Sequence, residues 1–423
     1  MTRRELGTTS TLRATRPSRV TAATLAIGGC IALASAVSAS PSDSSLNVPW
    51  QVTITDLGLL PGGIYSSGYA VNDTGKITGT AYDSTGALTN VQWVNGEISI
   101  MPGFDPSGAS IPEDLNDAGE GAGRLVIGVF LSYGIYWDSQ NNAFACEGLP
   151  GGGSSLTKAH GINASGQVTG IAKEGSPNFF GHAVVWLKNA LQSDLGFMGG
   201  GTYSEAYGIN DLGHVVGVAA IANTNQHAFL WQNGQYTDLS TWSGGTSNSK
   251  AYAINNQGVI VGLNNNVASR WQNGSVSPLP MPPGVSAFAP AIDINDAGDI
   301  IATATKVFPI EVGVLWRNGE AIALGTLPGG TISRARRINA AGEIVGEANA
   351  ANGNFHAVKW TVTLIAPPCP ADINGSGTVD AADLSVLLGA WGSANVAADV
   401  NDDGTVNAAD LSVLLGAWGG CGS

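Results

Sequence analysis

Short apolar runs separated by polar turns recur seven times along the chain. Each copy has an apolar residue, then Asn, two further residues and Gly, and then strand-like runs that end near a Trp. The spacing of 40 to 47 residues between copies is typical of a propeller, a solenoid or another repeat array. The repeated residues are Asn72, Asn116, Asn163, Asn210, Asn255, Asn295 and Asn339, followed by Trp93, Trp137, Trp186, Trp231, Trp271, Trp316 and Trp360.

The fourth copy shows the elements of one repeat most clearly. Four short apolar runs follow one another, at Ser204–Asn210, His214–Ala220, His227–Trp231 and Gln235–Leu239. The turns Asn-Asp-Leu-Gly and Asn-Gly suit tight hairpins, because Asn and Gly adopt positive φ at little steric cost. Helical periodicity is almost absent, so the pattern predicts four antiparallel strands in each repeat.

Four strands in about 44 residues is the size of one propeller blade. We therefore expect an all-β, seven-bladed β-propeller of four-stranded blades over residues 51–365. Gln51–Leu57 resembles the fourth strand of a repeat, and we expect it to complete the last blade and lock the ring. Closure would remove exposed strand edges. The second copy is degenerate around Gly121–Val126, which leaves six blades with one split blade as the alternative.

Two short motifs recur within this region. One begins with His-Ala and ends in Trp, and the other is Leu-Pro-Gly-Gly. They lie at His182–Trp186, His227–Trp231 and His356–Trp360, and at Leu60–Gly63, Leu149–Gly152 and Leu327–Gly330. With these motifs, residues 51–365 resemble a family of bacterial extracellular repeats named for the tripeptide His-Ala-Phe. The resemblance implies an exported repeat protein and supplies no reaction or ligand.

The first 39 residues have the pattern of a secretion signal. A basic start precedes the apolar run Val20–Ala36, and Val37–Ala39 offers small residues for cleavage. We expect a signal peptide at 1–39, a linker at 40–50, a secreted or cell-surface protein and no membrane span. Two alternatives stay open: a twin-arginine signal at Thr2–Leu6 and lipid attachment at Cys30.

Charge narrows the choice of partners. Without residues 1–39 the chain has 13 basic and 31 acidic residues, a net charge of about −18. Such a surface repels nucleic acid and anionic lipid, and it attracts divalent cations. We therefore expect no nucleic-acid partner. The low charged fraction and 59 Gly are typical of a β-rich extracellular protein.

The pattern changes after a Pro-rich linker at 366–371. Residues 372–423 hold a duplication with a 27-residue spacing, and each copy is followed by the same nine residues, LSVLLGAWG. Calcium binds six to eight oxygen ligands, and positions 1, 3, 5, 7, 9 and 12 of an EF-hand loop supply them. These positions hold Asp372, Asn374, Ser376, Thr378, Asp380 and Asp383 in the first copy, and Asp399, Asn401, Asp403, Thr405, Asn407 and Asp410 in the second.

We therefore expect two calcium ions, one in each loop. Gly377 and Gly404 occupy position 6, where the chain must turn sharply. Each closing acid, Asp383 or Asp410, is expected in the first turn of a helix. The alternative is a pair of Asx-rich turns without metal. Two tandem loops with every ligand position filled favour the metal.

Two such loop–helix units without an entering helix resemble a type I dockerin over residues 369–423. The resemblance implies calcium-dependent folding and docking onto a cohesin-like receptor or another cell-surface protein. Ser376 replaces the usual acid at position 5, so the first site is expected to be weaker. The helices are cut short by Gly389 and Gly416 and lack basic residues. This favours surface attachment or assembly over a cellulosome partner.

Three cysteines remain after the signal peptide. Cys146 stands alone in the second repeat and is expected to be a buried small hydrophobe. Cys369 and Cys421 bracket the C-terminal segment, and an oxidising compartment favours a disulfide between them.

No catalytic residue is predicted. His182, His227 and His356 share one repeat position that Val fills in other copies, which favours a structural role. The repeated Trp is expected in the core rather than at a sugar-stacking surface. No nucleophile motif, phosphate loop or zinc cluster is present. The charged residues nearest the inner strands are expected to be solvated rims rather than the lining of a funnel; they are His160, Glu205, Asp293, Arg336 and Arg337.

These observations favour a secreted, non-enzymatic binding or scaffold protein. A recognition propeller, for protein or for glycan, would be attached through a calcium-dependent module. The alternative is an exported polysaccharide hydrolase or lyase with its site in the funnel, dependent on Glu205 or Asp293. A purely structural surface-layer component is a third interpretation.

Overall fold

The computed structural model describes most of the chain beyond the predicted signal peptide. The described residues are 37–38, 50–101, 109–127, 131–151, 156–175, 180–222, 225–244, 248–285, 289–307, 309–364, 369–395, 397–401 and 403–420. Cys30, Cys421 and most of the predicted signal peptide and N-terminal linker lie outside them.

Each repeat forms an antiparallel array of four strands, ordered from the inside outward. The first strands are β3 (Ser66–Val71), β7 (Ala109–Leu115), β11 (Thr157–Ile162), β15 (Tyr203–Ile209), β19 (Ser249–Ile254), β23 (Ala291–Ile294) and β27 (Ser333–Ile338). The second strands are β4 (Ile77–Tyr82), β8 (Gly121–Ile127), β12 (Gln167–Lys173), β16 (Val215–Ala220), β20 (Ile260–Asn264), β24 (Ile300–Val307) and β28 (Ile344–Asn349).

The third and fourth strands complete these arrays. The third strands are β5 (Leu88–Val94), β9 (Leu131–Trp137), β13 (Gly181–Leu187), β17 (Gln226–Gln232), β21 (Val267–Gln272), β25 (Ile310–Arg317) and β29 (Phe355–Leu364). The fourth strands are β6 (Glu97–Ile100), β10 (Ala143–Ala145), β14 (Ala190–Gly196), β18 (Gln235–Asp238), β22 (Ser275–Pro278), β26 (Glu320–Ala323) and β2 (Trp50–Asp56). A short 3-10 helix, η1 (Leu239–Ser243), follows β18.

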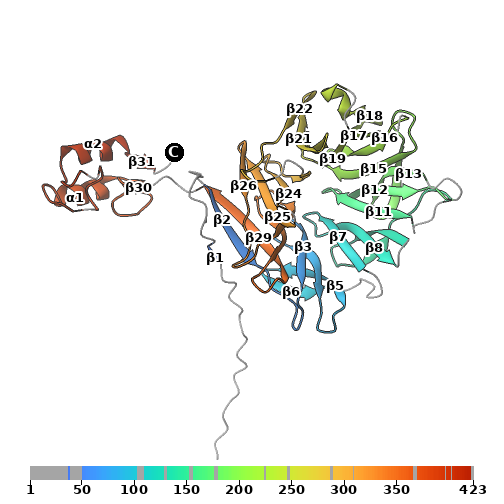
Figure 1. Cartoon of the computed structure of the whole chain (residues 1–423), viewed down its shortest axis with the longest axis horizontal. Coiled ribbons are helices and arrows are strands. Elements are labelled where there is room, and N and C mark those ends of the chain that lie inside the picture. The colour runs from blue at the N-terminus through green and yellow to red at the C-terminus, as the bar shows by residue number, and fades with distance from the viewer. Residues whose placement is uncertain are drawn as a thin grey trace, which may run out of the picture. The chain divides into compact units, whose positions relative to one another are not determined.

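Hydrogen bonding groups these strands into a propeller-like ring of small sheets, with β3, β7, β11, β15 and β19 near its centre (Figure 1). Four sheets have four strands, and a fifth has the order β1-β2-β29-β28-β27, in which β1 is Val37–Ser38. A further sheet, β11–β18, has eight strands. The prediction of seven separate four-stranded blades is therefore wrong. The third and fourth repeats merge because β13 and β15 pair in parallel, at Gly181 and Tyr203.

The N-terminal strand β2 lies in the same sheet as the last repeat. It pairs antiparallel with β29, from Trp50 opposite Leu364 to Asp56 opposite Val358. The prediction that this segment completes the last repeat is confirmed. Residues more than 300 positions apart thus pair in one ladder, which joins the two ends of the repeat array.

The repeated Trp fills the core between sheets. Six of the seven are buried, and five of these are less than 2% exposed. Trp231 is half-buried, and Phe229 occupies the buried position in that repeat. The expectation of a core Trp is thus confirmed at six positions.

The repeated His bridges the third strand and the fourth. The ring Nδ1 atoms of His182, His227 and His356 lie 2.8–2.9 Å from carboxylate oxygens of Asp194, Asp238 and Asp56. Each His–Asp pair thus joins two adjacent strands, which is the structural role expected for this His.

The C-terminal module forms two helices around a small core. Helices α1 (Ala381–Gly389) and α2 (Ala408–Gly416) follow the two loops, and β30 (Thr378–Val379) pairs with β31 (Gly419–Gly420). The buried residues are Ala371, Val379, Leu387, Ala398, Val400, Val406 and Leu414. In the described part of the chain, no helix has the length and apolarity that crossing a membrane requires.

Candidate functional site

The seven repeated Asn residues form a closed cycle of hydrogen bonds at the centre of the ring. Each side-chain Nδ2 donates to the main-chain carbonyl of the Asn in the next repeat, at 3.0–3.1 Å, and Asn339 donates to Asn72. Each Oδ1 accepts the N–H four residues further on, at 2.9–3.0 Å. The Asn is therefore more than a turn former, because it links every repeat to its neighbour.

The Asp that follows several of these Asn residues also links repeats. The N–H groups of Asp73, Ala164 and Ala340 donate to Asp117, Asp211 and Asp73, at 2.7–2.9 Å. From the sequence, the Asp of each Asn-Asp-x-Gly turn is expected only to form the turn. Their partners lie more than 40 residues away, so the local pattern does not contain this role.

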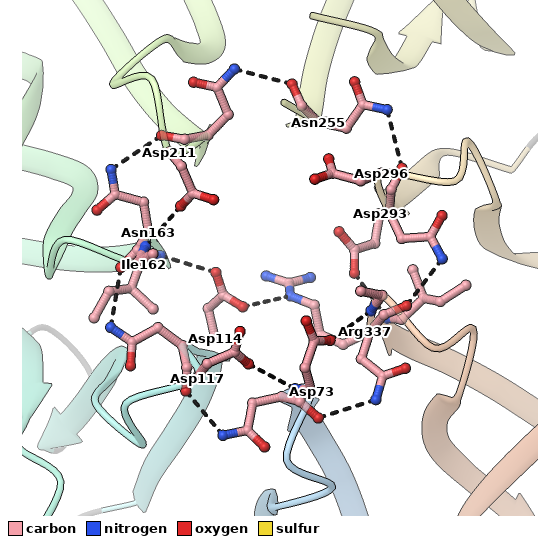
Figure 2. A pocket seen from close by; sticks show the side chains of 18 of the residues that line it. Asp73, Asp114, Asp117, Ile162, Asn163, Asp211, Asn255, Asp293, Asp296 and Arg337 are labelled. Carbon is pink, nitrogen blue, oxygen red and sulfur yellow. Dashed lines mark hydrogen bonds and ion pairs between the residues drawn. The ribbon is translucent and has the colours of Figure 1, made fainter. Parts of the chain in front are cut away.

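A cavity of about 210 Å³ opens inside the Asn cycle. Figure 2 shows Asp114 and Arg337 pointing toward one another across it, with Asp293 beside them. Arg337 Nε lies 3.5 Å from Asp114 Oδ1. The two carboxylates also accept main-chain N–H groups, Asp114 from Ile162 and Asp293 from Ile338. Burial raises the pKa of Asp293 to about 6.

A second charged cluster surrounds His160. The imidazole lies between two carboxylates, with Glu113 at 2.9 Å from Nδ1 and Glu205 at 2.9 Å from Nε2. Hydroxyls of Tyr203 and Tyr207 donate to the same Glu205 carboxylate. Burial alone would lower the pKa of His160, but Glu113 and Glu205 outweigh it and raise this pKa to about 9. Burial alone would raise the pKa of Glu205, but its hydrogen bond and charge interaction with His160 outweigh it and lower this pKa to about 2.

The expectation of solvated rims is wrong for this cluster. His160 is 8% exposed and Glu205 is 7% exposed. Asp293 and Arg337 line the cavity, and Arg336 stacks its guanidinium over the ring of Tyr69, 4.8 Å from the centroid. The five charged residues named from the sequence thus lie around the axis of the ring. This matches the alternative expectation, that they line a central funnel.

The second calcium loop gathers three carboxylates. One carboxylate oxygen from each of Asp399, Asp403 and Asp410 lies within 4.8 Å of the others. The N–H groups of Asp403 and Gly404 donate to Asp399, and those of Asn401 and Asn407 donate to Asp410. Three like charges held this close favour a divalent cation, and the hard oxygen donors fit calcium.

The first loop repeats this geometry with its three acids placed differently, at positions 1, 9 and 12 instead of 1, 5 and 12. Asn374 and Asp380 donate main-chain N–H groups to Asp383, and Ser376 and Gly377 donate to Asp372. The Ser376 hydroxyl donates to the Thr378 carbonyl. Among the described residues of this loop no three carboxylates converge: Ser376 stands where Asp403 stands in the other loop, and the third acid, Asp380, caps α1.

The loop backbone turns as position 6 requires. Gly377 and Gly404 have φ of +87° and +91°, in the left-handed region that favours glycine. Position 9 has a role that the calcium pattern did not predict. Asp380 and Asn407 cap α1 and α2, and Asp383 and Asp410 complete a capping box. The closing acid thus belongs to both the loop and the first helical turn.

The cysteines bear on the same module. Cys369 belongs to a disulfide, while its predicted partner, Cys421, lies outside the described residues, so that pairing stays a prediction. Cys146 is free and fully buried, and burial raises the pKa of its thiol.

Comparison with known families identifies the C-terminal module. Residues 370–416 match the family model of the dockerin type I domain. That match covers one segment and leaves the ring unassigned. No curated protein matches the chain.

Solved structures resemble the ring at low identity. A puromycin hydrolase is 14% identical, over 70% of this chain and 51% of that chain, with a TM-score of 0.44. An oligogalacturonate lyase from Vibrio parahaemolyticus is 10% identical, over 79% and 97%, with a TM-score of 0.48. A lectin from Aleuria aurantia is 9% identical, over 73% and 98%, with a TM-score of 0.36. The chain spans about half the length of the first of these, and with TM-scores below 0.5 none of them assigns a function.

Proposed function

We propose that the protein is an exported, non-enzymatic binding or scaffold protein. Its ring recognises a ligand, and its C-terminal module docks with calcium onto a cohesin-like or other cell-surface partner. The dockerin match at 370–416 carries this proposal. The acidic group of the second loop supports it, because that group is suited to the cation that would order the module. The motifs beginning with His-Ala and the pattern of residues 1–39 support export.

Each loop is proposed to hold one calcium ion. The first ion would be bound by Asp372, Asn374, Ser376, Thr378, Asp380 and Asp383, and the second by Asp399, Asn401, Asp403, Thr405, Asn407 and Asp410. Calcium would add positive charge where the carboxylates converge, and so relieve the repulsion between them. A disulfide between Cys369 and Cys421 would join the two ends of the module.

The helices offer a surface for the docking partner. Val386, Leu388 and Trp391 are 42%, 52% and 47% exposed, and the equivalent Val413, Leu415 and Trp418 are 42%, 53% and 49% exposed. Exposed apolar side chains on a small module indicate an interface with another protein. Neither helix has basic residues in its last turn, so the contact is proposed to be mainly apolar.

Binding to immobilised purified cohesin domains tests the docking function. The mature chain is passed over them in calcium and then in EGTA, as wild type and with Asp399→Ala and Asp410→Ala together. We expect retention by at least one cohesin in calcium only, lost in the double variant and weakened by Trp391→Ala with Trp418→Ala. Asp83→Ala, in an exposed turn of the ring, is the matched control. Retention that persists in EGTA would contradict calcium-dependent docking.

A polysaccharide hydrolase or lyase is the second candidate. The observation in its favour is the Asp293 carboxyl, whose pKa of about 6 would suit proton transfer at the cavity. Polysaccharide cleavage by the wild type that is lost in Asp293→Asn would establish this alternative.

A further inference from the structure

Each inner strand of the ring has a β-bulge at the same place. In all seven repeats the register between the first and second strands shifts at the same place. The shift lies between the residues four and two positions before the Asn of the hydrogen-bond cycle. A bulge inserts one extra residue and redirects its side chain. The inserted residues are Tyr69, Glu113, His160, Tyr207, Tyr252, Ile292 and Arg336, and we call them the bulge layer.

Contacts between neighbouring repeats show that this layer surrounds the axis. His160 contacts Glu113 on one side, and its ring centroid lies 5.3 Å from that of Tyr207 on the other. Tyr207 and Tyr252 have centroids 5.3 Å apart. Arg336 lies over Tyr69 across the junction of the last and first repeats. Six of the seven side chains are aromatic or ionisable, which a purely structural core would not require.

Most of the arginines that follow residue 39 lie in or beside this layer. Six arginines follow residue 39, and four lie in or beside the bulge layer. Arg124 pairs with Glu113 at 3.3 Å, and Arg334 pairs with Glu347 at 2.7 Å. Arg336 belongs to the layer itself, and Arg337 is its sequence neighbour at the cavity. Arg270 and Arg317 are the two that lie elsewhere.

Arg336 keeps most of its donors unused. Its side chain is 35% exposed, and its one ion pair joins Nη2 to Glu347 at 3.4 Å. The Nε atom is buried and has no hydrogen-bond partner among the described residues. A guanidinium has five N–H donors arranged to bind a carboxylate at two points. The Arg336 guanidinium also lies over the Tyr69 ring, a contact that favours this position of the side chain.

We propose that the bulge layer is a binding site for a carboxylated sugar, with Arg336 holding the carboxylate. The faces of Tyr69 and Tyr252 would pack against the sugar ring, and the carboxylates of Glu113 and Glu205 would accept its hydroxyls. Ion pairs in and beside the layer join Arg124, His160, Arg334 and Arg336 to Glu113, Glu205, Glu311 and Glu347, and Arg337 pairs with Asp114.

This inference deepens the proposed function, because it names the ligand class of the ring. Calorimetric titration tests it, using the mature chain in calcium with a β-1,4-linked glucuronate tetramer and the matching neutral glucose tetramer. We expect the glucuronate to bind at least tenfold more tightly than the glucose oligomer. Arg336→Gln is expected to weaken glucuronate binding tenfold or more, since a lost charged hydrogen bond is worth about 1.5–3 kcal/mol. Arg270→Gln, on the third strand of another repeat, is the matched control and should bind as the wild type does.

Two further variants keep the test decisive if Arg336→Gln does not fold. Arg336→Lys keeps the charge but not the two-point geometry and should weaken binding, and Tyr69→Leu should weaken the acidic and the neutral oligomer alike. Equal affinity for the two oligomers, no binding of either, or glucuronate binding unchanged in the folded Arg336 variants would overturn the proposal. The same titration with Asp399→Ala and Asp410→Ala should be unchanged, so failed docking and failed sugar binding are distinguishable.

Discussion

The ring has seven copies that share their apolar surfaces, whereas the C-terminal module has two copies around a single small core. In the ring, clusters such as the one containing Ile301, Leu315 and Trp360 draw residues from neighbouring repeats. In the module, Leu387 and Leu414 meet a handful of small residues. Burial grows with the number of shared faces, so the ring can be stable without a ligand and the module cannot rely on its core alone.

The two regions also treat their polar groups differently. The ring satisfies Asn255 and its six equivalents within the protein, since both ends of each amide have partners. The module instead gathers Asp399, Asp403 and Asp410 where no basic side chain pairs with them among the described residues. Sequence repetition thus produces a ring that satisfies its own polar groups and a module for which we propose a bound cation.

Removing calcium would separate the two regions most sharply. We expect EGTA to unfold α1 and α2 while the ring strands stay protected, because calcium at 100 times its Kd contributes about 2.7 kcal/mol to the folded state. Amide hydrogen exchange measured segment by segment checks this. Helical protection that survives EGTA would show that the small core suffices.

Breaking the Asn cycle would test the self-sufficiency of the ring. Asn255→Ala removes the side-chain hydrogen bonds to the Asn295 carbonyl and from the Val259 N–H, so we expect a loss of about 3 kcal/mol in unfolding free energy. Urea unfolding measures it. Asn352→Ala, at an exposed turn, is the control and should change stability by less than about 0.5 kcal/mol. A neutral Asn255 variant would mean that the cycle is not what holds the repeats.

The buried His160 cluster predicts how ring stability varies with pH. The pKa of His160 is raised from 6.5 to about 9, so its stabilisation is full below pH 6.5 and is lost as pH rises through 9. The pKa of Glu205 is lowered from 4.5 to about 2, so its share is full above pH 4.5 and is lost as pH falls through 2.

Thermal unfolding between pH 3 and pH 10 measures this profile. His160→Gln should be less stable than the wild type between about pH 4.5 and 6.5, and its curve should flatten between pH 6.5 and 9. If the thermal stability of the wild type does not decline between pH 6.5 and 9, the charged form of His160 does not stabilise the ring. The module offers no comparable effect, since no histidine lies in residues 369–423.

The smallest effect concerns the difference between the two calcium loops. Ser376→Asp places an acid at position 5, as Asp403 does in the second loop, so we expect the calcium affinity of the first loop to rise on the order of tenfold. The reverse change, Asp403→Ser, should lower the affinity of the second loop by a similar factor. Calorimetric titration of both variants with calcium compares the loops. If Ser376→Asp does not raise the calcium affinity, position 5 is not the cause of a difference between the two loops.

Local spacing was enough to predict the repeat, the strands and the two loop–helix units of the C-terminal module. The Asn-x-x-Gly turn, the closing strand β2 and the positions from Asp372 to Asp383 are all contained in short stretches of chain. Composition likewise indicated the acidic surface. These features depend on neighbours within a few residues or on a period that the chain displays directly.

Only the tertiary structure decided what the repeats do to one another. The pairing of β13 with β15, the Asn cycle and the bulge layer join residues about 20 to more than 260 positions apart. The bulge layer had one local signal, the run Arg336-Arg337 where most copies have Tyr or His followed by a small residue. That signal can be interpreted only once the arrangement of the repeats around the ring is known. Which side chains meet across the ring depends on how the repeats close on one another, and the sequence of one repeat does not contain that information.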